Sequence, residues 1–338
     1  MKAFGIVESA PVERQDCFVS FSTPIPELAP TDVLVKVKAI GVNPVDTKVR
    51  KMTSGVLEMP RILGWDASGE IIDVGSAVTG FQAGDAVFYA GDITRPGCNA
   101  EYQCVDYRLI ARKPQRLSFE EAAAMPLTVL TAWEGFERMH LAEGKTLLII
   151  GAAGGVGSIA IQLAKQSGCQ IIATASRPET RQWCLDLGAD AVIDHRGDIP
   201  AQCRELGFEQ VDAIANFVDT DGYWDVMGEL IAPFGELFLI VEPKIALRVG
   251  DPLKAKCVSI IWEFMFSRAR FQTPDMAHQS EILRQAAELF DAGVLRHTMT
   301  THLGSLSVST LREAHGLLES GRCVGKIVMS VDHEADEN

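Results

Sequence analysis

The sequence predicts an α/β protein in which a doubly wound parallel sheet follows a separate, β-rich domain. Residues 147–165, LLIIGAAGGVGSIAIQLAK, place an apolar run, a glycine cluster and a helical apolar repeat one after another. Before them, residues 1–121 hold short strands and glycine turns, and from residue 122 onward strands alternate with helical stretches. At 338 residues and 47% hydrophobic composition, the chain is long enough for two domains.

The β-rich part comes first along the chain and is expected to return at its end. Strands are predicted at 33–37 and 69–74, with turns marked by Gly75, Gly80 and Gly84, which is typical of an antiparallel or barrel-like domain. Residues 271–338 hold helical patterns at 281–289 and 309–319 and further short strands. We therefore divide the chain into a first β-rich part (1–121), a parallel-sheet domain (122–270) and a return to the β-rich domain (271–338).

The strand at 147–150 carries no polar alternation, as expected of a strand buried on both faces of a parallel sheet. The glycines that follow are three residues apart, and an apolar stripe then begins a helix inside the cluster. A glycine turn lets the backbone approach a pyrophosphate, which the N–H groups of the helix stabilise. The expected contacts are Gly151, Ala153, Gly154, Gly155, Val156 and Gly157. The alternative is a glycine-rich turn that binds nothing. No Gly-Lys-Ser/Thr ending is present, which excludes a P-loop.

The next strand, 170–175, decides which dinucleotide is expected. An acidic side chain at its end would bond the ribose 2′-hydroxyl of NAD, but Ser176 and Arg177 stand there instead. This favours the 2′-phosphate of NADP(H). Arg177 could also be a solvated surface charge, and Glu179 keeps NAD(H) open. Further strands at 191–193, 211–215 and 236–241 complete the predicted sheet.

Composition excludes several classes of partner. The net charge is −14 and no basic run occurs, which argues against DNA or RNA. No segment has about 18 uninterrupted apolar residues, and the N-terminus does not resemble a signal peptide, so we expect no membrane association and a cytoplasmic protein. The eight cysteines are scattered, which favours buried free thiols over a disulfide framework.

Several motifs in order give a specific resemblance along essentially the whole chain. They are GVNPVD (41–46), GWDASG (64–69), GDAV (84–87), AAAMPLT (122–128), the 151–157 glycines, LGAD (187–190) and GKIV (325–328). The chain thereby resembles the medium-chain dehydrogenase/reductase superfamily, and within it the quinone oxidoreductases and the zinc-type alcohol-dehydrogenase-like group. This resemblance implies a GroES-like catalytic domain, a Rossmann coenzyme domain, a small-molecule substrate and a homodimer or homotetramer. It also adds Thr128, His195 and Lys326 to the expected cofactor-binding residues.

The resemblance also implies where a metal would bind. Zinc-containing relatives carry a cysteine at the position of Asn43, a His-Glu pair at Trp65-Asp66 and a third ligand near Leu127. A zinc site normally needs three Cys, His or carboxylate ligands, and at most Asp66 remains. The structural-zinc lobe needs four cysteines between about 90 and 110, where only two occur. We expect no metal.

Without a Lewis acid, plain alcohol chemistry is disfavoured and conjugated acceptors suit the site better. The expected function is hydride transfer from NADPH to a quinone or an α,β-unsaturated carbonyl compound. The alternatives are a zinc-dependent alcohol dehydrogenase and a non-catalytic NADPH-binding protein.

Four residues are catalytic candidates, each with an ordinary structural alternative. Asn43 precedes a proline that restricts its backbone, and its amide could donate to the acceptor oxygen or only tie the loop to neighbouring backbone. Asp46 could relay a proton or form a surface pair with Lys48. Tyr89 could donate from its phenol or be a half-buried strand-end tyrosine, and Trp65 could form a flat wall for a ring or belong to the core.

Overall fold

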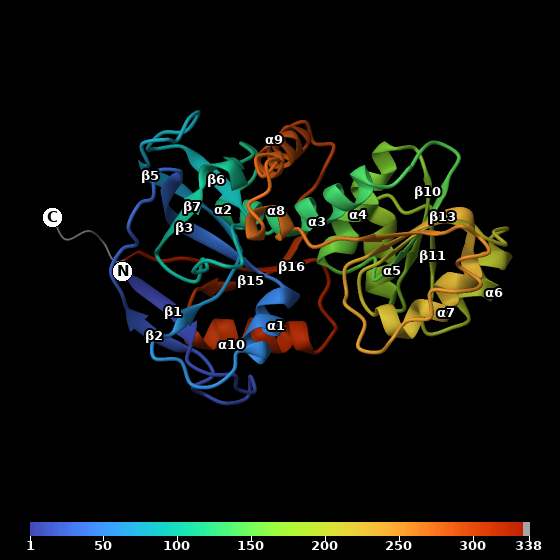
Figure 1. The fold of residues 1–338 in the computed structure, drawn as a ribbon, viewed down its shortest axis with the longest axis horizontal. Coiled ribbons are helices and arrows are strands. Elements are labelled where there is room, and N and C mark those ends of the chain that lie inside the picture. The colour runs from blue at the N-terminus through green and yellow to red at the C-terminus, as the bar shows by residue number, and fades with distance from the viewer. Residues whose placement is uncertain (334–338) are drawn as a thin grey trace. The chain divides into compact units, whose positions relative to one another are not determined.

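The structure is a computed structural model that describes residues 1–333, and the chain forms two compact units (Figure 1). Unit 1 comprises residues 1–130 and 266–338, and unit 2 comprises residues 131–265. The helix α3 (Pro126–Glu137) begins in unit 1 and continues into unit 2. Within residues 1–333, no helix is both long and apolar enough to cross a membrane.

Unit 1 contains two sheets. The smaller has the order β2 (Val19–Ser22), β1 (Lys2–Ile6), β4 (Arg61–Ile62). The larger has the order β15 (Met299–Ser305), β16 (Lys326–Ser330), β3 (Asp32–Val42), β5 (Asp66–Val74), β6 (Ala86–Tyr89), β8 (Ile110–Arg112), with β7 (Tyr102–Asp106) also paired to β3. Its helices are α1 (Pro44–Met52), η1 (Tyr107–Leu109), α2 (Phe119–Ala123), α8 (Ser267–Arg270), α9 (His278–Asp291) and α10 (Val308–Glu319).

The strand β3 positions the polar residues of unit 1. Its sequence, DVLVKVKAIGV, is apolar over most of its length, and it pairs with β5, β7 and β16. The register places Gly41 opposite Asp66, the first residue of β5, and Val42 opposite Ile327 near the start of β16. Since Asn43 follows β3 directly, Asn43, Asp66 and Lys326 lie at the same end of three adjacent strands.

Unit 2 is built on one parallel sheet of six strands. The order is β11 (Ala191–Ile193), β10 (Gln170–Thr174), β9 (Thr146–Ile150), β12 (Val211–Asn216), β13 (Ile231–Leu239), β14 (Ser259–Trp262), and every pairing is parallel. The helices α4 (Gly155–Gln166), α5 (Pro178–Asp186), α6 (Ile199–Glu205) and α7 (Thr220–Leu230) connect these strands. All five residues of β9 are buried in the middle of the sheet. The predicted doubly wound sheet is confirmed.

Most predicted elements lie where the sequence placed them, and their ends differ by a few residues. The strand predicted at 236–241 begins earlier, at Ile231, because β13 pairs with β12 from Val211 onward across a register shift. The edge strand β14 was not predicted, since four residues with alternating exposure give little periodicity. None of the eight cysteines forms a disulfide, and six of them are buried.

Candidate active site

The glycine loop joins β9 to α4, and its glycines differ in the space that a side chain would have at each position. Gly151 has a φ of 81°, and a Cβ there would lie 2.1 Å from Cγ2 of Val218. A Cβ on Gly157 would lie 2.4 Å from the Gly151 carbonyl oxygen. At Gly154 the only neighbour within 4 Å of a Cβ is that same carbonyl oxygen, at 3.4 Å. Close packing therefore explains why residues 151 and 157 are glycine, whereas the space beside Gly154 is open.

The N-terminus of α4 supplies hydrogen-bond donors beside that open space. Gly154 is the N-cap, with φ −75° and ψ 178°, and it provides no side chain to cap the helix. The N–H groups of Gly155, Val156 and Gly157 belong to the first turn, where no acceptor within the helix is available. Ala153 precedes them in the turn. Free N–H groups and the positive end of the helix dipole suit a phosphate.

The end of β10 carries the residues expected to contact the ribose. The Nε atom of Arg177 lies 3.0 Å from Oε1 of Glu179, and the Arg177 side chain is 32% exposed. Arg181 is committed elsewhere, because it donates to the backbone oxygens of Ala175 and Val192. Arg177 is therefore the arginine at this strand end that we consider for a ligand, and its exposed ion pair with Glu179 is of a weak kind. Ser176 precedes it, half-buried.

His195 lies just after β11 and is exposed. The carboxyl ends of parallel strands meet at one edge of the sheet, so His195 shares that edge with Arg177.

In unit 1, Asn43, Asp66 and Lys326 form a buried polar cluster. Nδ2 of Asn43 donates to Oδ2 of Asp66 at 2.8 Å, and the Lys326 ammonium lies 2.8 Å from the same oxygen. The ammonium also donates to the Asn43 amide oxygen and to the backbone oxygen of Val42. The other oxygen of Asp66 accepts from the Leu127 N–H at 2.7 Å. The side chains of Lys326 and Asp66 are 3% and 0% exposed.

Asp46 lies in the first turn of α1, beside this cluster. Its Oδ2 accepts from the Asn43 N–H at 2.6 Å, whereas its buried Oδ1 has no hydrogen-bond partner among residues 1–333. Burial raises the pKa of Asp46 to about 7, and the negative charge of Asp66 acts in the same direction, while Lys326 and the Asn43 N–H oppose the rise. The alternative surface pair with Lys48 is wrong, because Asp46 is buried and Lys48 is exposed.

The remaining candidates of unit 1 lie in its interior. Tyr89 is 1% exposed, its hydroxyl has no partner among the described residues, and burial holds its pKa well above the ordinary value. Trp65 is also 1% exposed; its Nε1 donates to the Asp92 oxygen at 3.2 Å and its ring meets Phe266 edge to face. Thr128 is buried and donates to the Met125 oxygen.

Two family models match the chain, one over part of unit 1 and the other mainly over unit 2. Residues 29–115 match the alcohol dehydrogenase GroES-like domain, and residues 155–278 match the zinc-binding dehydrogenase domain. A "Zinc-type alcohol dehydrogenase-like protein" of Staphylococcus epidermidis is 41% identical over 338 residues, covering 98% of this chain and all of the relative. The chain belongs to the medium-chain dehydrogenase/reductase superfamily. The resemblance deduced from its motifs is confirmed, as is the combination of a GroES-like domain with a parallel-sheet coenzyme domain.

Two further members of the superfamily are informative. A crystal structure from Rhizobium etli CFN 42, provisionally described as a zinc-dependent alcohol dehydrogenase, has a TM-score of 0.94 and 43% identity over 99% of both chains. The "2-methylene-furan-3-one reductase" of Solanum lycopersicum is 30% identical over 90% of this chain and 73% of its own length. The chain is thus similar to proteins named for two different activities.

The residues of the cluster do not fit the zinc that the domain name implies. Among residues 1–333, no group of three His, Cys, Asp or Glu side chains could hold a metal ion. Asp66, the one carboxylate at an expected ligand position, already binds an ammonium, an amide and a backbone N–H. The Cys98 thiol donates to the Asp66 backbone oxygen, and burial raises its pKa well above the ordinary value, whereas zinc binds the thiolate.

Sequence reasoning placed Lys326 among the cofactor contacts and did not connect it with Asn43. The structure brings the two together from 283 residues apart. The signal that could have found this pairing was strand register, since Asn43 directly follows β3 while Asp66 and Lys326 begin β5 and β16. Register between distant strands is set by the assembled sheet and cannot be read from local periodicity.

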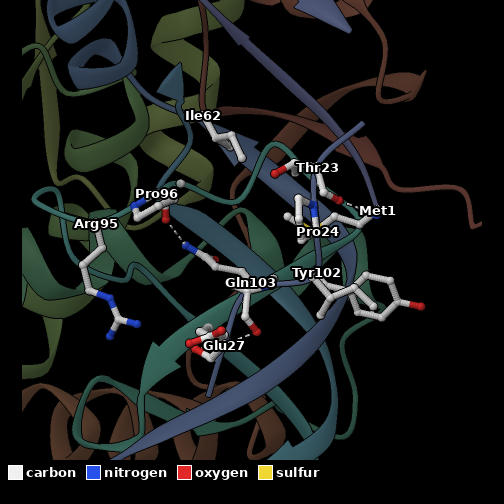
Figure 2. A pocket seen from close by; sticks show the side chains of 13 residues that line it. Met1, Thr23, Pro24, Glu27, Ile62, Arg95, Pro96, Tyr102 and Gln103 are labelled. Carbon is white, nitrogen blue, oxygen red and sulfur yellow. Dashed lines mark hydrogen bonds between the residues drawn. The ribbon is translucent and has the colours of Figure 1, made fainter. Parts of the chain in front are cut away.

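Unit 1 also contains a pocket that none of the predicted site residues lines (Figure 2). Its wall includes the Thr23–Glu27 segment, Ile62 and Tyr102. Figure 2 shows the Gln103 amide donating to the Pro96 carbonyl oxygen, at 3.0 Å. The pocket is therefore separate from the residues of the candidate active site.

Proposed function

We propose that this chain is an NADPH-dependent reductase of quinones or α,β-unsaturated carbonyl compounds. The observation that carries the proposal is the Asn43 amide, which Lys326 holds at its oxygen and Asp66 at its nitrogen. An amide nitrogen carries two hydrogens, and the structure gives Nδ2 one acceptor, Asp66, among the described residues. The Asn43 side chain is buried, and we assign to its second N–H the role of donor to an acceptor oxygen that gains negative charge.

The glycine loop fits the dinucleotide. The open space beside Gly154 and the first-turn N–H groups of Gly155 and Val156 suit a pyrophosphate. Arg177 would bind a 2′-phosphate through charge-assisted hydrogen bonds in place of its exposed pair with Glu179. When bound, NADPH supplies a hydride to the acceptor.

In unit 1, residues of the chain would stabilise the negative charge that hydride addition produces and would supply a proton. Adding hydride to a conjugated acceptor places negative charge on its oxygen, and a preorganised N–H donor stabilises that charge. Asp46 is the one carboxyl beside the cluster that carries a proton in part of the molecules near neutral pH, because its pKa is about 7. We assign to Asp46 the role of proton reservoir, and to Tyr89 that of a buried phenol that stays protonated.

The tomato relative's name supports an activated alkene as the acceptor, because 2-methylene-furan-3-one is itself an α,β-unsaturated ketone. A quinone presents the same electronic arrangement, a carbonyl conjugated to a carbon that accepts hydride. The fixed amide donor suits both.

The test measures the loss of NADPH absorbance with a panel of quinones, enones and simple aldehydes. The reverse reaction is tested by incubating the protein with ethanol and NADP⁺ and measuring NADPH formation. We expect turnover with at least one conjugated acceptor and none with simple aldehydes. Oxidation of simple alcohols that zinc stimulates would favour the zinc-dependent alcohol dehydrogenase alternative. NADPH binding without turnover of any acceptor would favour the non-catalytic alternative.

A further inference from the structure

Lys326 is the centre of a site that has the form of a cation site. Its Nζ atom lies 3.1 Å from the Val42 backbone oxygen and 2.8 Å from Oδ2 of Asp66, and it donates to the Asn43 amide oxygen as well. An ammonium group has three N–H donors, so these three oxygens use all of them. The site is enclosed, since Lys326 and Asp66 are 3% and 0% exposed.

The oxygens around Lys326 are those that hard divalent cations bind. One carboxylate, one side-chain amide and one backbone carbonyl are typical ligands of Mg²⁺, Mn²⁺ and Ca²⁺. They come from the end of β3, the residue after it and the start of β5, so the pairing of β3 with β5 fixes the backbone at these positions.

A second carboxyl group, that of Asp46, lies beside these oxygens, since its Oδ2 accepts from the Asn43 N–H at 2.6 Å. Oδ1 of Asp46 is buried and has no partner in the part of the chain that the structure describes. Asp46 is near enough to interact electrostatically with both Lys326 and Asp66. Two carboxylates would balance a divalent cation, whereas in the wild-type protein the single positive charge of Lys326 is matched by Asp66.

We propose that the Lys326 ammonium is the resident cation of this site, that it keeps metal ions out, and that removing it creates a site for a divalent cation. A metal ion entering the wild-type site would meet a fixed positive charge and would find the oxygens already bonded. The inference goes beyond the proposed reductase activity and does not depend on it.

Lys326→Met tests the proposal, because methionine keeps the apolar part of the side chain and removes the charge. Lys256 provides a matched control: its ammonium donates to the backbone oxygens of Gly228, Glu229 and Ile231, and within residues 1–333 to no carboxylate. A second control, Asp66→Asn combined with Lys326→Met, removes both charges from the cluster.

The probe is MnCl2, and the readouts are bound manganese after desalting and the midpoint of thermal unfolding, Tm. For Lys326→Met we expect about one bound Mn²⁺ per chain and a Tm that rises with added Mn²⁺. Wild type, Lys256→Met and the double variant should bind less than a tenth of that amount, with unchanged Tm. Protein purified without chelator should contain no stoichiometric zinc.

Three results would overturn the proposal. One is stoichiometric manganese or zinc in the wild-type protein at the Lys326 cluster, shown by its loss in Asp66→Asn. Another is a folded Lys326→Met that binds no Mn²⁺. The third is a Lys326→Met variant that stays unfolded both with and without Mn²⁺, because a metal that replaces the lost charge should restore folding. Folding of this variant only in the presence of Mn²⁺ would support the proposal.

Discussion

Replacing Gly154 should separate nucleotide binding from folding, and Gly157 provides the matched comparison. At Gly154 the backbone has φ −75° and ψ 178°, which any residue adopts, and a new Cβ meets nothing closer than 3.4 Å. At Gly157 a new Cβ would lie 2.4 Å from the Gly151 carbonyl oxygen and 2.6 Å from Cα of Ala152. The two positions therefore differ in what an added methyl group disturbs.

The expected magnitudes follow from these distances. Gly154→Val should lower the free energy of unfolding by no more than about 1–2 kcal/mol, because its Cβ meets no close neighbour and the main cost is that valine is a poorer N-cap residue than glycine. Gly157→Ala should cost about 1–3 kcal/mol, the usual range for overpacking. If the valine denies a pyrophosphate one or two charge-assisted hydrogen bonds of about 1.5–3 kcal/mol each, NADPH affinity should fall at least about tenfold and up to roughly ten-thousandfold.

The assay pairs urea unfolding with titration of NADPH against intrinsic fluorescence, in wild type, Gly154→Val and Gly157→Ala. A folded Gly154→Val that binds NADPH with wild-type affinity would refute the assignment of this loop to the pyrophosphate. A Gly157→Ala variant as stable as wild type would show that the close approach at Gly157 relaxes without cost.

Three further predictions concern the cofactor and the polar cluster. Arg177→Ala should reduce the preference for NADPH over NADH roughly ten- to a hundredfold and leave the affinity for NADH unchanged, which is checked by measuring the Kd of each nucleotide. An unchanged preference would exclude Arg177 from 2′-phosphate binding. Asn43→Ala should lower the single-turnover rate at saturating NADPH by up to ~10²–10³-fold, the range for loss of one oxyanion donor. The affinity for NADPH should stay within about twofold of wild type. A wild-type rate would leave Asn43 with a structural role only. Burial raises the pKa of Asp46 from 3.8 to about 7, so between about pH 4 and pH 7 the folded protein holds a proton there that the unfolded chain releases. The free energy of unfolding should therefore fall as the pH rises through this range, by up to about 1.4 kcal/mol per pH unit. Asp46→Asn should remove this fall, and unfolding curves that change with pH alike in variant and wild type would contradict it.

The sequence by itself determined the architecture of unit 2 and the general class of the protein. A buried apolar strand, a glycine turn and an amphipathic helix are local patterns, and the strand β9 and helix α4 formed where those patterns predicted them. The Ser176-Arg177 pair after β10 is equally local, so the sequence alone favoured NADP(H). The family motifs placed a GroES-like domain before it, as the comparisons confirm.

Only the tertiary structure decided how the polar residues of unit 1 are used. Sequence spacing suggested a surface pair between Asp46 and Lys48, but residues two apart on a helix face different directions, and the fold buries Asp46 while exposing Lys48. Lys326 meets Asn43 and Asp66 because β16 and β5 both pair with β3 in one particular register. Contacts between distant strands depend on the whole sheet and its buried faces, which is why no local pattern could assign this ammonium its three oxygens.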